Sequence, residues 1–179
     1  MAYTVILDAG HGGANPGAVY NGRQEKDDAL RLTLAIGQLL ENAGINVVYT
    51  RTTDIYESPA RKAAEANEAG ADYFVSIHRN SSVYPNQYTG IETLVYSFYG
   101  PAAEMAANIN ENLEALGFVN QGVNERTNLI VLNQTQMPSL LVEVGFINND
   151  QDNILFDSRF QEIAQAIADG IIDTLNAQG

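Results

Sequence analysis

The sequence of 179 residues contains no cysteine and only two histidines. The lack of cysteine excludes disulfide bonds and metal sites built on thiolates. No stretch approaches the roughly 18–20 apolar residues that a membrane-spanning helix needs. The chain runs from Met1 directly into the apolar Val5-Ile6-Leu7, without a basic segment or a long apolar run. No signal peptide is therefore predicted.

Positive charge is also scarce in this sequence. Lysine and arginine total 9 against 22 aspartates and glutamates, which gives a formal net charge of −13. Nucleic-acid binding usually needs a basic surface, and an anionic membrane repels an acidic one. We therefore expect neither nucleic acid nor a membrane as a partner, and we attribute the acidity to solubility.

Apolar residues make up 45% of the chain, enough for a sizeable core, and their spacing alternates between strand and helix patterns. Strands are predicted at residues 3–7, 45–50, 73–77, 90–97, 129–132 and 140–144, and helices at residues 27–43, 58–69, 101–116 and 161–175. Such alternation predicts an α/β sandwich with a central, mostly parallel twisted sheet flanked by helices. Without repeats or a linker, residues 1–179 are expected to form a single domain.

Both histidines, His11 and His78, follow a predicted apolar strand. Ligands of open α/β sheets bind at the carboxyl ends of the strands, so a metal site is favoured over two ordinary loop histidines. A catalytic zinc site uses three protein ligands and a water, and two imidazoles with one carboxylate would suffice. Spacing alone leaves the carboxylate open, and no HExxH is present. The candidates are Asp8, Glu25, Asp27, Asp28, Glu92 and Glu143.

Glu143 stands out because it interrupts the apolar run Leu140–Phe146 (LLVEVGF). Burial would raise its pKa, as a general base requires, although an edge strand could also turn it towards solvent. The glycines of Gly10-His11-Gly12-Gly13 match no phosphate-binding motif. We interpret them as permitting the backbone turns that aim His11 and let a bulky substrate approach.

Several spaced motifs together resemble the zinc-dependent N-acetylmuramoyl-L-alanine amidases, the amidase-3 family, over nearly the whole chain. The matching segments, in order, are VILDAGHGGANPG (residues 5–17), Glu25-Lys26, Thr50-Arg51, Arg61 with Ala66-Asn67, ADYFVSIHRN (residues 71–80), Met137-Pro138, and LVEVGF (residues 141–146) with Asn148. Each motif is weak alone, whereas their common order makes the resemblance specific.

The resemblance implies that one zinc ion is held by His11, Glu25 and His78, with Glu143 as the catalytic glutamate. It implies hydrolysis of the amide between the lactyl group of N-acetylmuramic acid and L-alanine in peptidoglycan. Three positions depart from the family pattern: Ala9 replaces a proline, Arg79 a small residue, and Gln121 an arginine that commonly precedes Gly-Val. Arg79 and Asn80 are candidate substrate contacts. Arg79 is included because it places a long cation beside His78, where it could alter how the substrate is contacted.

Two rival functions use the same residues. One is a zinc peptidase that cuts within the stem peptide, and the other is a non-catalytic wall-binding module.

The resemblance places the protein at the bacterial cell wall, outside the cytoplasm, as an autolysin, a sporulation enzyme or a phage endolysin. Its export route is open, because a leader could have been removed or another route used. An acidic enzyme gains no steering towards an anionic wall, so a separate wall-binding module outside this chain is also expected.

Overall fold

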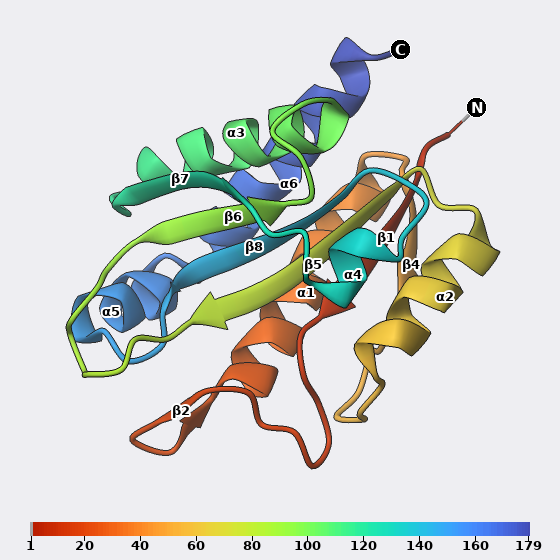
Figure 1. Ribbon diagram of the computed structural model, residues 1–179. Coiled ribbons are helices and arrows are strands. Elements are labelled where there is room, and N and C mark those ends of the chain that lie inside the picture. Colours follow the sequence, from red (N-terminus) through yellow and green to blue (C-terminus); the bar gives the residue numbers. More distant parts are fainter. Residues whose placement is uncertain (1) are drawn as a thin grey trace.

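The computed structural model describes residues 2–179, and its centre is a six-stranded sheet in the order β4-β1-β5-β8-β6-β7 (Figure 1). Neighbours among β4, β1, β5 and β8 run parallel, whereas β6 runs antiparallel to β8 and parallel to β7. The strands are β1 (Thr4–Ala9), β4 (Asn46–Tyr49), β5 (Tyr73–Asn80), β6 (Ile91–Val95), β7 (Asn120–Glu125) and β8 (Ser139–Phe146). A small antiparallel ribbon, β2 (Val19–Tyr20) and β3 (Arg23–Gln24), precedes the first helix.

Helices cover both faces of the sheet. The face with the larger core is packed by α1 (Glu25–Asn42), α3 (Pro101–Glu114) and α6 (Phe160–Ala177), and the opposite face by α2 (Pro59–Ala69) and the short α4 (Ile130–Asn133). Helix α5 (Asp150–Ser158) follows the end of β8 (Figure 1). Within residues 2–179, no helix combines the length and the apolar character needed to cross a membrane.

Alternation along the central strands sorts their side chains between the two faces. On β5, Val75 and Ile77 enter the larger core with α1, α3 and α6, while Phe74 enters the smaller core with α2 and α4. On β8, Val142 and Val144 enter the larger core and Leu141 the smaller one. The same alternation decides where the polar residues near the strand ends point, and so positions the site described below.

The fold class predicted from the sequence is confirmed, with corrections to individual elements. The run Leu129–Leu132 was predicted as a strand, but residues 130–133 form α4. Four apolar residues are too few to show a helical period, so a buried strand and one buried helical turn look alike. Strand β7 was missed because NQGVNE is polar, as edge strands can be. The helix predicted from residue 27 begins at Glu25, and β2, β3 and α5 were not predicted.

Candidate metal centre and active site

Three polar side chains form a row across neighbouring strands on the sheet face that α2 and α4 cover. The Cα of His78 on β5 pairs with that of Glu143 on β8, and Glu143 pairs with Glu92 on β6. By alternation, His78 lies on the same face as Phe74, and Glu143 on the same face as Leu141. Strand β5 runs two residues beyond His78, further than predicted. The register therefore places an imidazole beside two carboxyl groups near one edge of the sheet.

His11 reaches this edge from the loop after β1. Its backbone has a φ of +62°, an uncommon conformation for a residue with a side chain. Its Nδ1 lies 3.1 Å from Oδ1 of Asn15, which also accepts a hydrogen bond from the backbone N–H of Gly17. If Nδ1 carries the proton and donates to Asn15, the Nε2 lone pair is free for a metal ion.

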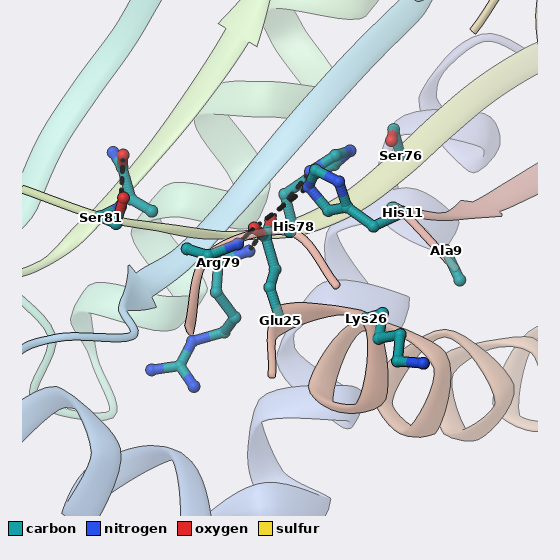
Figure 2. Close-up of polar contacts among 12 residues, drawn as sticks. Ala9, His11, Glu25, Lys26, Ser76, His78, Arg79 and Ser81 are labelled. Carbon is teal, nitrogen blue, oxygen red and sulfur yellow. Dashed lines mark hydrogen bonds and ion pairs between the residues drawn. The ribbon is translucent and has the colours of Figure 1, made fainter. Parts of the chain in front are cut away.

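Glu25, the first residue of α1, brings the carboxylate to both imidazoles. Its Oε2 lies 3.1 Å from Nε2 of His11, and its Oε1 lies 3.0 Å from Nδ1 of His78. Backbone N–H groups of Ala18 and Arg79 donate to the same two oxygens at 2.9 and 3.0 Å. Figure 2 shows the labelled side chains of Glu25, His11 and His78 pointing towards one another. The loop before β2 and the end of β5 thus hold one carboxylate in place.

The three residues fit a zinc ion by donor chemistry and by spacing. One possible ligand atom from each of His11, Glu25 and His78 lies within 4.8 Å of the others. Two imidazole nitrogens and one carboxylate oxygen are a common protein ligand set for catalytic zinc. Burial alone would raise the pKa of Glu25, but the hydrogen bonds from both histidines outweigh it and lower that pKa. Burial would lower the pKa of His78, and the Glu25 carboxylate raises it instead.

Two glycines leave the space that this cluster occupies. A Cβ on Gly10 would lie 2.4 Å from Cε1 of the His78 ring. A Cβ on Gly17 would lie 2.6 Å from both Oε2 of Glu25 and Cδ2 of His11. Real Cβ atoms do not approach other atoms this closely, so any larger residue at either position would displace a metal-ligand candidate.

Glu143 has the environment of a general base. The side chain is partly buried, and its Oε2 is closed off from solvent without a hydrogen-bond partner in the described part of the chain. Burial raises the pKa of Glu143 to about 7, with the charges of Glu25 and Glu92 adding to the rise and His78 opposing it. A pKa near neutrality suits a group that must both take and give a proton.

Two hollows flank the row formed by His78 and Glu143. The larger, about 350 Å³, borders both imidazoles and is otherwise lined mainly by residues of α2, α4 and the loops before them, including Tyr56, Lys62 and Ile130. The smaller, about 180 Å³, lies over β6 and β7 and is lined by Asn80, Tyr88, Glu92, Gln121 and Phe146. Because β5 and β8 stand between β1 and β6 in the sheet, the candidate catalytic groups lie between the two hollows.

The remaining carboxylate candidates do not join the metal-ligand cluster among residues 2–179. Asp8 is buried and pairs with Nζ of Lys62 at 2.8 Å, and it also accepts hydrogen bonds from Thr50 and Ser76. Asp28 pairs with arginines, and Asp27 is exposed. Glu92 lies beside Glu143 rather than beside the imidazoles.

Arg79 does not point towards a substrate. Its side chain is only 1% exposed, and its guanidinium pairs with Asp28 at 2.7 Å, bonds Asn153 at 2.8 Å and stacks 4.2 Å from the Phe156 ring centroid. Alternation along β5 turns residue 79 to the face opposite His78, and Figure 2 shows its guanidinium extending away from the imidazoles. The structure therefore does not support the substrate contact expected for Arg79. Asn80 lines the smaller hollow, where such a contact remains a proposal.

Sequence reasoning missed Asn15 and Lys62. Asn15 orients His11, and its signal was available, because an Asn four residues after a candidate ligand is a plausible second hydrogen-bonding group. Lys62 lines the larger hollow while its ammonium group neutralises Asp8. No sequence pattern marks this buried pair, because the two residues are 54 positions apart and meet only when α2 packs on the sheet.

Comparison with known proteins agrees with this geometry. The sequence profile described as N-acetylmuramoyl-L-alanine amidase matches residues 5–173. The chain is 36% identical over 178 residues to the sporulation-specific N-acetylmuramoyl-L-alanine amidase of Bacillus subtilis (strain 168), covering 96% of this chain and 68% of that protein. It is 33% identical over 183 residues to the endolysin of Bacillus phage SPP1, covering 98% and 67%.

Solved structures give the same result. The crystal structure of the N-acetylmuramoyl-L-alanine amidase from Clostridium difficile 630 superposes with a TM-score of 0.92 at 32% identity, covering 99% of both chains. The catalytic domain of CwlV from Bacillus (Paenibacillus) polymyxa var. colistinus gives 0.88 at 33% identity, covering 97% of this chain and 98% of that domain. Sequence and fold therefore agree, and this chain belongs to the N-acetylmuramoyl-L-alanine amidase family.

Proposed function

We propose that this protein is a zinc-dependent N-acetylmuramoyl-L-alanine amidase. Its substrate would be peptidoglycan, and the bond cleaved would be the amide between the lactyl group of N-acetylmuramic acid and L-alanine. The observation that carries the proposal is the cluster of His11, Glu25 and His78, with Glu143 directly across from His78 on the neighbouring strand. The family of the chain supplies the substrate class, which the cluster alone does not.

The proposed ligands are His11, Glu25 and His78, and a zinc ion bound to them would supply Lewis acidity towards a carbonyl and a water molecule. Asn15 would fix the orientation of His11, and the backbone N–H groups of Ala18 and Arg79 would fix that of Glu25. These contacts preorganise the ligands before any substrate arrives.

Glu143 is the proposed general base and acid. It would take a proton from the attacking water as the water oxygen bonds to the amide carbonyl carbon. It would then give that proton to the amide nitrogen as the carbon–nitrogen bond breaks, which frees the amino group of L-alanine and leaves a lactyl carboxyl group. The absence of a hydrogen-bond partner on its buried Oε2, within residues 2–179, leaves this oxygen available for such transfers.

The test is digestion of purified peptidoglycan by the zinc-loaded protein, followed by mass spectrometry of the products. Intact stem peptides with a free L-alanine amino group are expected, and a chelator should abolish their release. Shortened peptides would favour a zinc peptidase instead. Bound zinc without hydrolysis of any wall preparation would favour a non-catalytic wall-binding module.

The proposed site of action is the bacterial cell wall outside the cytoplasm. The relatives that match 94–98% of this chain include a sporulation-specific amidase, a probable cell wall amidase and an endolysin. The residues of the proposed site come from the loop after β1, the start of α1 and the strands β5 and β8.

A further inference from the structure

The smaller hollow, beside Glu143, has a mixed polar and aromatic lining. Its wall combines one carboxylate, Glu92, with the side-chain amides of Asn80 and Gln121 and the rings of Tyr88 and Phe146. No lysine or arginine takes part in the lining, as far as residues 2–179 are concerned. Because Glu92 stands directly across from Glu143, any group in this hollow also lies near a second acid.

Hydrogen bonds inside the wall leave both donors and acceptors for a ligand. Nε2 of Gln121 donates to the carbonyl of Thr89 at 2.8 Å, which leaves its amide oxygen as an acceptor. One oxygen of Glu92 accepts from Nδ2 of Asn124 at 3.0 Å, which leaves the other oxygen available. Oδ1 of Asn80 accepts from the backbone N–H of Ser81 at 2.9 Å, so its NH₂ group remains a donor.

A primary carboxamide complements this arrangement. Its NH₂ group can donate to Glu92 and Gln121 while its carbonyl oxygen accepts from Asn80. A carboxylate in the same position would offer no donor to Glu92 and would lie beside a like charge without a compensating cation. Stem peptides of peptidoglycan carry carboxyl groups that occur either free or amidated, and the two forms differ in charge and in the donors that they would present to Glu92.

We propose that this hollow, through Glu92 and Gln121, selects stem peptides in which the carboxyl group near the cleaved bond is amidated. The inference rests on the proposed function, because it names the substrate class of that same site. The neutral Gln121 occupies the position at which the sequence departs from an arginine. With a cation there, the hollow would contain a partner for a carboxylate instead.

The experiment compares two soluble substrates, N-acetylmuramoyl-L-alanyl-D-isoglutamine and its counterpart ending in D-glutamate, which differ only in this amide. The zinc-loaded full chain is assayed for kcat/KM by chromatography of the freed dipeptide. The amidated substrate is expected to be preferred by about 10-fold or more. Q121R and E92Q should each shrink the preference, and the double variant should reverse it.

Gln38→Arg is the matched control for the added charge. Gln38 is exposed on α1, 13 residues after Glu25 and hence about 20 Å along the helix, and its variant should keep the wild-type preference. Equal use of both substrates, or a preference that Q121R and E92Q leave unchanged, would overturn this inference while wall digestion still supported the amidase. Loss of hydrolysis on every substrate, purified wall included, would overturn both proposals together.

Discussion

Replacing Glu143 by glutamine should lower the rate of catalysis while raising the stability of the metal-free protein. The substitution keeps the shape of the side chain but removes the group that accepts the water proton. Since general acid–base catalysis contributes about 10²–10⁴ in rate, kcat on soluble muropeptide should fall by that factor. Zinc content should stay at the wild-type value, because the three proposed ligands are untouched. The matched control is Glu111→Gln on the exposed side of α3, which removes the same charge away from the site.

The same substitution should stabilise the metal-free protein in a pH-dependent way. Burial raises the pKa of Glu143 from 4.5 to about 7 in the folded state, so folding favours the protonated form. Ionised Glu143 therefore does not lower the free energy of unfolding of the wild type below about pH 4.5. The loss of stability grows between about pH 4.5 and pH 7 and is complete above about pH 7. At about 1.4 kcal/mol for each pKa unit, the loss reaches at most about 3.5 kcal/mol.

Urea unfolding at pH 5 and pH 8 with a chelator present measures this difference. The free energy of unfolding of Glu143→Gln should exceed that of the wild type by more at pH 8 than at pH 5. Wild-type turnover in the fully metal-loaded variant would refute the catalytic role. A stability difference that does not change with pH would refute the claim that the carboxyl group is buried without compensation.

Three further predictions concern the surroundings of the metal-ligand cluster. Glu25→Gln should weaken zinc binding by at least about 10-fold, as competition with a chromogenic chelator would measure, because the anionic ligand is lost; an unchanged affinity would exclude Glu25 as a ligand. Gly10→Ala should lower zinc occupancy in elemental analysis, because its methyl group would push His78 from its position, and full occupancy would contradict the close packing described above. Arg79→Ala should lower the free energy of unfolding, measured in urea, by about 3–5 kcal/mol, because it leaves Asp28 buried without one of its two arginines. A decrease below about 1 kcal/mol would show that Arg79 contributes little to stability.

That His11 and His78 would lie close together was easier to predict from the sequence than the directions in which neighbouring side chains point. Two histidines after two apolar strands indicated one edge of a parallel sheet, because such strands present their ends together. The sequence pattern left six carboxylates as possible third ligands, and only the family resemblance singled out Glu25. The structure brings Glu25 to the imidazoles through the β2–β3 ribbon, which is too short to leave a pattern in the sequence.

Arg79 shows where reasoning from sequence neighbours fails. Its position next to His78 suggested a substrate contact, yet adjacent residues of a strand point to opposite faces of the sheet. The partners that hold it, Asp28 and Asn153, are 51 and 74 positions away and meet it only when α1 and α5 pack on β5. Short apolar segments such as Leu129–Leu132 were ambiguous for a different reason, since packing rather than periodicity decides their secondary structure.

A zinc-edge anomalous difference map from crystals of the metal-loaded protein tests the central claim most directly. We predict a single strong peak for each chain, within bonding distance of about 2.0–2.2 Å from one atom each of His11, Glu25 and His78. The Glu143 carboxyl group should face that peak without bonding to it. Zinc bound by a different set of residues, or no peak at this cluster at saturating zinc, would contradict the account.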